Sequence, residues 1–159
     1  MPRQRAWVKY TENKYHTALR EHHCDVNLEN LTATQTEIEQ IKYEMVRHEA
    51  FRAGEPILVF KGRYGGYYVV DGHTRARVLW DTGKKTVPAI LYTSPDAEVC
   101  AEQERIAIAV GGDREKRVWE IPIVDRVGKG SDAWKQRRQE LLEGWKAESE
   151  AAQEGPTQG

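Results

Sequence analysis

Hydrophobic residues between positions 23 and 112 fall into runs whose spacing changes from one segment to the next. Val26, Leu28 and Leu31 form a pattern typical of a short strand and turn. Further along, apolar residues recur on one helical face, at Ile38, Ile41, Met45 and Val46. The pattern therefore predicts an extended segment followed by a helix.

Threonine and glutamate mark the start of that helix. Thr34 with Glu37 matches a capping box, in which the two side chains bond free amides at the helix start. Thr36 with Glu39 fits the same motif. Gly54, just before a proline, is typical of the helix end. With Thr34 as the cap, Glu37 lies in the first turn, where the helix dipole favours an ionised carboxylate.

A hairpin is predicted next. Residues 57–60 and 67–70 are apolar, β-branched and aromatic, and the glycine-rich segment 61–66 separates them. Runs of this kind on either side of a glycine-rich segment are typical of two antiparallel strands joined by a turn. The second strand leads directly into the polar segment 71–75.

Beyond that segment the spacing becomes helical again. Residues 76–80 continue a helix that Gly83 suits as a stop, and residues 87–91 form another buried strand. The sequence Ser94-Pro95-Asp96 then caps a third helix that reaches about Val110. Strands and helices in this order predict an α/β (α+β) fold, with a small mixed β-sheet and helices packed on it.

The chain divides into four parts on this reading. Residues 1–22 form a basic arm without a strong period, and residues 23–112 form the mixed domain. Residues 113–147 form an extension with a C-terminal helix whose stripe contains Trp134, Leu141, Leu142 and Trp145. Residues 148–159 contain little to bury, so a disordered tail is expected there.

Composition adds limits on partners and location. The 24 Lys and Arg residues balance 25 Asp and Glu, so overall charge gives no argument for nucleic acid. The arm of residues 1–22 is different, because its cations suit phosphates and its aromatic residues suit bases. DNA is therefore a candidate partner of the arm. Cys24 and Cys100 have no CxxC partner, and no apolar run is long enough for a bilayer. A cytoplasmic protein with no membrane partner is expected.

Histidines near the N-terminus raise the question of a metal. His16, His22 and His23 precede Cys24, but adjacent histidines do not readily reach one site, and no second Cys/His pair completes a ligand set. No structural metal site is predicted at these residues.

The segment Asp71-Gly72-His73-Thr74-Arg75 carries candidate chemistry. A strand that passes through glycine into a helix presents free amides and partial positive charge, and both attract anions. Arg75 offers a planar donor fork to phosphate, His73 donates or exchanges a proton, and Thr74 offers a hydroxyl. Asp71 either holds a phosphate-bridging metal or orients His73. In the alternative reading Asp71 caps the helix, Gly72 serves the turn and Arg75 lies in solvent.

The same residues resemble the ParB N-terminal/sulfiredoxin superfamily. The match includes segments 67–76 and 83–89, together with the upstream segments 31–37 and 54–59. It covers roughly residues 26–91, less than half of the chain. The resemblance implies a small α/β fold that binds nucleotide phosphates. Members include partition proteins, serine kinases that use ADP or ATP, and cysteine sulfinic acid reductases.

This sequence distinguishes among those members. The reductases carry Cys-His where this chain has His73-Thr74, so reductase chemistry is not expected. Partition proteins usually have Gly-Glu-Arg-Arg at residues 72–75 and add a DNA-binding domain, for which few residues remain after Leu91. The kinase branch carries Asp-Gly-His-His-Arg, which this chain matches except at Thr74. That departure puts kinase activity in doubt.

The resemblance implies specific roles. Glu37, Asp71 and His73 are the candidate catalytic residues, with Glu37 as the base that acts on a small hydroxyl acceptor or water. The phosphate-binding candidates are Thr34, Gln35, Gly72, His73, Thr74 and Arg75. The expected ligands are ADP or ATP, with CTP as a further candidate, together with magnesium. The leading reading is a nucleotide-binding phosphotransferase or hydrolase. The alternative is a DNA-associated regulatory module in which nucleotide acts as a switch without phosphotransfer.

Overall fold

The computed structural model describes residues 3–154 and contains a mixed five-stranded sheet with the strand order β1-β6-β4-β5-β2. Its strands are β1 (Arg20–Asn27), β2 (Leu31–Thr32), β4 (Ile57–Lys61), β5 (Tyr67–Asp71) and β6 (Thr86–Thr93). β4 pairs antiparallel with β5 and parallel with β6, whereas β1 pairs antiparallel with β6. The predicted hairpin, buried strand and mixed α+β class are therefore confirmed.

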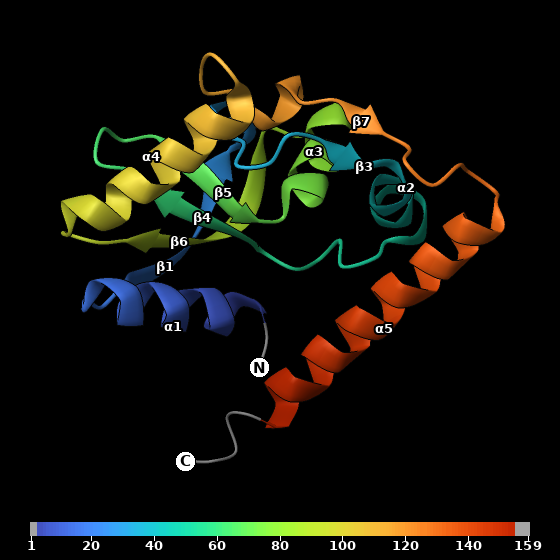
Figure 1. Ribbon diagram of the computed structural model, residues 1–159, viewed down its shortest axis with the longest axis horizontal. Coiled ribbons are helices and arrows are strands. Elements are labelled where there is room, and N and C mark those ends of the chain that lie inside the picture. Colours follow the sequence, from blue (N-terminus) through green and yellow to red (C-terminus); the bar gives the residue numbers. More distant parts are fainter. Residues whose placement is uncertain (1–2, 155–159) are drawn as a thin grey trace.

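Alternating side chains of β4 supply a core on each face of the sheet. Ile57 and Val59 join one apolar cluster, while Leu58 and Phe60 join the other. The first cluster includes side chains of α2 (Gln40–Glu49) and α3 (His73–Asp81). The second includes side chains of α4 (Ala97–Gly111) and α1 (Arg3–Tyr15). Since strand side chains alternate between faces, each face of the sheet carries its own pair of helices, as Figure 1 lets the reader follow.

The start of α2 corrects the sequence prediction. The helix begins at Gln40, its N-cap is Glu39, and none of the described side chains caps it. The preceding residues form a short strand, β3 (Ile38–Glu39), which pairs in parallel with β7 (Ile123–Val124). The Ile38 amide donates to the Pro122 carbonyl at 2.8 Å. Pairing with this distant segment holds the chain extended where local signals predict helix, so neither capping box forms.

The segment 118–124 is less regular than its apolar pattern suggests. A 3₁₀ turn, η2 (Val118–Glu120), precedes β7, and a similar turn, η1 (Leu28–Asn30), follows β1. The indole of Trp119 stacks on that of Trp80 at 5.4 Å between ring centroids, and its Nε1 donates to the Glu29 carbonyl. η2 therefore packs against α3 and η1 before the chain turns into β7.

The N-terminal residues also differ from expectation. The predicted arm is largely the helix α1 followed by the start of the edge strand β1. The Trp7 ring lies 5.3 Å from Tyr92 and 6.1 Å from Phe60, measured between centroids. These contacts place α1 on the sheet, so residues 6–22 belong to the folded body and not to a solvated arm.

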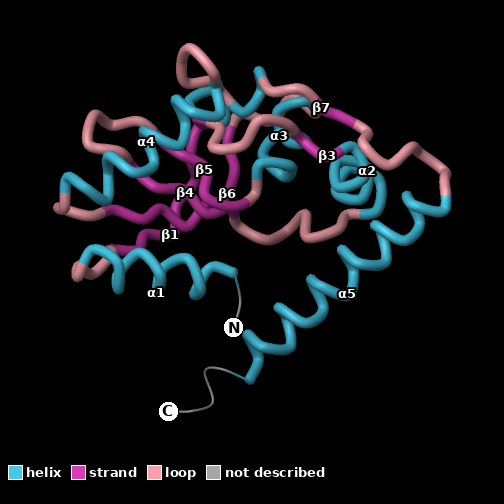
Figure 2. Tube along the Cα trace, in the orientation of Figure 1, coloured by secondary structure: helices cyan, strands magenta, loops and turns pink. Residues whose placement is uncertain are grey.

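The C-terminal helix α5 (Asp132–Glu154) follows a long loop after β7, visible in Figure 2. It continues past residue 148, so the part of the predicted tail up to Glu154 is helical, and residues 155–159 lie outside the described residues. The Ser131 hydroxyl, just before the helix, accepts a hydrogen bond from the Trp134 amide. α5 lies beside α2 in Figure 1.

Ion pairs attach this region to the segment around α2. Each joins a cation of residues 126–138 to a glutamate of residues 37–49: Arg126–Glu37, Lys129–Glu44, Arg137–Glu39 and Arg138–Glu49. The attachment of the extension thus depends strongly on charge. Among residues 3–154, no helix has the length and apolar character that a membrane span requires.

Candidate functional site

A pocket of about 370 Å³ lies where three helices meet. The strand-to-helix junction of residues 71–75 forms one wall, Lys42 and Val46 of α2 form a second, and α5 forms a third. Phe51 and Arg52, from the turn after α2, and Gln35, from the loop before β3, also line it. The contiguous segment singled out from the sequence therefore opens onto a cavity of ligand size.

Gly72 connects β5 to α3 and is required by the packing there. It is the N-cap of α3 and has a φ of 111°, a conformation that L side chains rarely adopt. A Cβ at this position would lie 2.4 Å from Cγ2 of Ile57. The missing side chain thus makes room for a buried isoleucine of β4. The first amides of α3 have no acceptor within their own helix, and the helix dipole adds partial positive charge there. This end of α3 therefore favours an anion.

His73 is almost completely buried, with 5% of its surface exposed. Its Nε2 lies 2.9 Å from the Thr34 amide nitrogen and accepts that hydrogen bond. Burial lowers the pKa of His73 to about 3, so the ring is neutral near pH 7. Thr34 itself donates from Oγ1 to the Val69 carbonyl. These bonds tie the loop before β3 to the end of β5 and leave His73 as a neutral acceptor.

Arg75 lies in the fold, contrary to the solvent-exposed alternative. Its side chain is 6% exposed, and Nη1 donates to the carbonyls of Glu55 and Pro56 at 3.1 Å each. Nη2 lies 3.3 Å from Oδ2 of Asp71. The guanidinium therefore joins the segment before β4 to the end of β5. Truncating Arg75 would remove donors from buried acceptors, so this residue supports the fold as well as the pocket wall.

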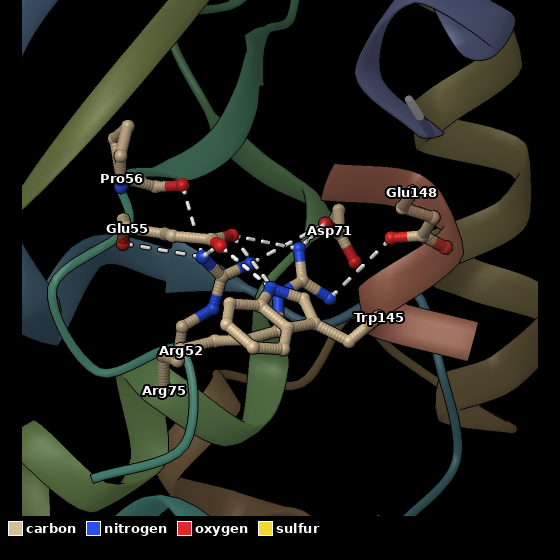
Figure 3. Close-up of polar contacts among 7 residues, drawn as sticks. All are labelled: Arg52, Glu55, Pro56, Asp71, Arg75, Trp145 and Glu148. Atoms are coloured by element: carbon tan, nitrogen blue, oxygen red, sulfur yellow. Dashed lines mark hydrogen bonds and ion pairs between the residues drawn. The ribbon is translucent and has the colours of Figure 1, made fainter. Parts of the chain in front are cut away.

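Arg52 is a functional candidate that sequence reasoning missed. Its Nη2 lies 2.9 Å from Oε2 of Glu55 and 3.7 Å from Oδ2 of Asp71. Figure 3 shows the guanidinium groups of Arg52 and Arg75 among these carboxylates, with Trp145 and Glu148 of α5 beside them. Arg52 has a φ of 54°, unusual for a residue with a side chain. The backbone of Arg52 is thus in the left-handed region, and in this turn its side chain lines the pocket.

The remaining predicted residues separate into two groups. Gln35 and Thr74 line the pocket, and Nε2 of Gln35 also donates to the Glu37 carbonyl at 2.7 Å. Glu37 is not among the lining residues. Its carboxylate binds Arg126 through two bonds of 2.5 and 2.7 Å, and this guanidinium holds the pKa of Glu37 below its usual value. Glu37 is therefore ionised but committed to Arg126, outside the first turn of α2.

α5 contributes pocket-lining residues that do not belong to any contiguous motif in the sequence. Arg137, Leu141 and Trp145 face the pocket on successive turns of the helix. The stripe containing Leu141 and Trp145 is visible in the sequence, but a stripe at this spacing is more often part of the chain's own core. The indole of Trp145 packs edge-on against Phe51 and donates to Oε1 of Glu55 at 2.8 Å. It thereby serves both as packing and as pocket wall.

Metal-binding groups are sparse around the pocket. Within residues 3–154, no group of three or more His, Cys, Asp or Glu side chains is placed to hold a metal ion. Asp71 is the predicted carboxylate at the pocket, and two guanidinium groups already neutralise it. Magnesium commonly binds through one or two carboxylates and the ligand's phosphates. Both guanidinium groups contact Oδ2 of Asp71, and their positive charge disfavours a magnesium ion at that oxygen.

Comparisons with known proteins give a fold-level likeness only. No protein-family model matches the chain, and no curated protein matches it. Among solved structures it is similar to protein Atu1540 from Agrobacterium tumefaciens, with 16% identity and a TM-score of 0.37. It is also similar to a Pnob8-like ParB-N domain, with 15% identity and a TM-score of 0.38.

These matches cover 77% and 82% of this chain but only 50% and 49% of the other chains, so it spans about half of their length. The description of the second match names a ParB-N domain, the type of domain that the sequence resembles. Both TM-scores are below 0.5 and both identities are below 20%, so neither likeness carries an argument about this chain.

Proposed function

We propose that this protein binds a nucleotide through its phosphates in the pocket between α2, α3 and α5, and that it acts as a binding or switch module. The observation that supports this most is the position of the first turn of α3. That turn lines the same pocket as Lys42, Arg52 and Arg137. Free amides, the positive end of a helix and nearby cations together favour a phosphate.

Apolar lining residues support a nucleotide over a simple anion. Val46, Phe51, Leu141 and Trp145 add apolar and aromatic groups to a lining that also contains several charged residues. Ligand sites typically combine apolar and aromatic walls with a few placed polar groups. A nucleotide has a flat base and a charged phosphate chain, so its two ends suit these two kinds of lining residue.

The three candidate catalytic residues are already bonded to other protein groups, which favours ligand binding without phosphotransfer. Glu37 is bound to Arg126, His73 is buried as a neutral acceptor, and Asp71 is paired with arginine. A general base must lie within hydrogen-bond reach of the proton that it removes. Phosphotransfer remains a second candidate because the Asp71 carboxylate lines the pocket beside the start of α3.

A binding experiment with a matched control tests the proposal. Calorimetric titration with pyrophosphate, ADP, ATP and CTP, each with and without magnesium, measures affinity directly. Lys42→Gln removes a cation from the pocket wall and should weaken binding by about tenfold or more, since a charge-assisted contact contributes roughly 1.5–3 kcal/mol. Lys84→Gln makes the same charge change on an exposed loop and should leave affinity unchanged.

Two outcomes would count against the assignment. Absence of binding for every probe would remove nucleotide from the function. Equal losses for Lys42→Gln and Lys84→Gln would place binding elsewhere. Phosphate release or transfer by the unmodified protein would favour the phosphotransfer candidate, with Glu37→Gln as the test of its base. DNA binding through residues 1–22 stays a prediction, and on α1 the Lys14 ammonium already pairs with Glu102 at 2.9 Å.

A further inference from the structure

Two carboxylates of α5 lie in a pocket that otherwise suits an anion. Glu140 and Glu148 both line it, on the same helix that provides Arg137. Arg137 is bound to Glu39 through two hydrogen bonds of 2.7 and 3.1 Å, so its charge is largely used there. α5 therefore adds more negative than positive charge to the site. A wall made only to hold phosphate would be expected to do the reverse.

Glu148 takes a position that a ligand anion would be expected to occupy. Its Oε2 lies 3.9 Å from Nη1 of Arg52, while Nη2 of the same guanidinium contacts Glu55 and Asp71. Figure 3 shows Glu148 reaching across from α5 to Arg52. The contact is longer than a hydrogen bond and longer than the Arg52–Glu55 pair, so it is the weakest of these three contacts of Arg52.

The turn that carries Arg52 supports a role beyond packing. Ala50 and Arg52 both have positive φ angles, 56° and 54°, in a stretch without glycine. Unfavourable backbone conformations of this kind concentrate at ligand clamps and switch regions. Here they direct Arg52 toward both Asp71 and α5, where it contacts the body of the protein and the α5 wall at once.

We propose that Glu148 is an internal competitor for the phosphate ligand, and that a bound phosphate displaces this carboxylate from Arg52. The proposal rests on the proposed function, since it concerns the same pocket. A phosphate bonds a guanidinium through two parallel contacts, whereas the Glu148 carboxylate approaches Nη1 of Arg52 only to 3.9 Å. The exchange at Arg52 therefore favours the ligand.

Neutralising Glu148 tests the competition. In calorimetric titrations with pyrophosphate and ADP, Glu148→Gln should bind about threefold to tenfold more tightly than the unmodified protein, because the probe no longer displaces a charge. Glu143→Gln is the matched control: the same change on the same helix, at an exposed residue whose partner is Gln139. Its affinity should equal that of the unmodified protein. Equal affinities of all three proteins would overturn the competition.

A second measurement on the unmodified protein follows α5 itself. Hydrogen exchange of amides 142–150 should become faster when ADP saturates the site, because the ligand releases Glu148. Slower exchange would mean that α5 closes on the ligand as a clamp, and it would overturn the proposal even with binding confirmed. Failure of both the unmodified protein and Glu148→Gln to bind either probe would instead contradict the proposed function, and this inference with it.

Discussion

Gly72 shows how one residue is required by a neighbour inside the fold. The sequence suggested that a glycine here lets a ligand approach the backbone, but a Cβ would first meet Ile57 of the adjacent strand. Its φ of 111° adds a second requirement. The pocket thus depends on Gly72 through the position of α3, because any shift of this junction would move the amides of the helix start.

Replacing this glycine should reveal both requirements. Gly72→Ala is expected to lower the free energy of unfolding by about 2–4 kcal/mol, since it combines backbone strain with overpacking against Ile57. Gly83→Ala is the control: Gly83 has a φ of 86°, but none of the described atoms around it lies within 4 Å of where the new methyl group would be. It should lose only about 1 kcal/mol. Urea unfolding of both variants measures the difference, and equal losses would show that Ile57 moves away freely.

At the scale of elements, α5 is the part of the pocket most easily detached. Its pairs with the α2 region join side chains that are substantially exposed, such as Arg138 at 41% and Glu49 at 43%. Exposed ion pairs contribute about 0–1 kcal/mol each and weaken with salt. The apolar contribution to its docking includes the edge-on contact of Trp145 with Phe51. α5 should therefore open before the sheet unfolds.

Reversing the charge of Arg138 in its ion pair with Glu49 tests whether α5 opens first. Arg138→Glu places two carboxylates together and should speed hydrogen exchange of amides 132–150 by about threefold to tenfold, while amides of β4 and β6 stay protected. The double variant Arg138→Glu with Glu49→Arg restores opposite charges and should return exchange toward the original rate. In the unmodified protein, raising salt from about 0.1 M to about 1 M should also speed hydrogen exchange of these amides, because salt screens the ion pair. No recovery in the double variant would exclude the ion pair as the cause.

At the scale of the whole molecule, α1 completes the second core. Trp7 packs on Phe60 and Tyr92, which are both fully buried in the face of the sheet that α4 also covers. Thr11 of the same helix is 1% exposed. The N-terminal helix is therefore part of the stability of the domain, and loss of residues 1–14 would act on the fold before acting on any partner.

Replacing Trp7 tests whether α1 contributes to the stability of the fold. Trp7→Ala should reduce the free energy of unfolding by about 2–4 kcal/mol, because a large aromatic side chain leaves the core. Tyr10→Ala lies on the same helix but at a side chain 56% exposed, and it should change stability by less than about 0.5 kcal/mol. Chemical denaturation of both variants measures this. Similar stability of the two would mean that α1 is a solvated arm after all.

Sequence reasoning located the elements that local signals define. The hairpin, the helix after residue 72, the strand before Ser94 and the Asp96-capped α4 all lie close to where their patterns placed them. The pocket segment 71–75 was found because its members are contiguous and sit at a strand-to-helix junction. Such signals act between residues a few positions apart, so they are readable without the fold.

The tertiary structure alone decided what surrounds those elements. Pairing with β7 kept Ile38 and Glu39 out of a helix, Arg126 drew Glu37 away from the pocket, and α5 supplied the third wall. These contacts join positions far apart in the chain, as for Arg126 and Glu37 with a separation of 89. The sequence by itself determined the β4–β5 hairpin, α3, β6 and α4, and where helix-start amides that attract anions arise. Which side chains meet there depends on long-range packing and ion pairing, whose energies depend on distances in space and leave no periodic pattern along the chain.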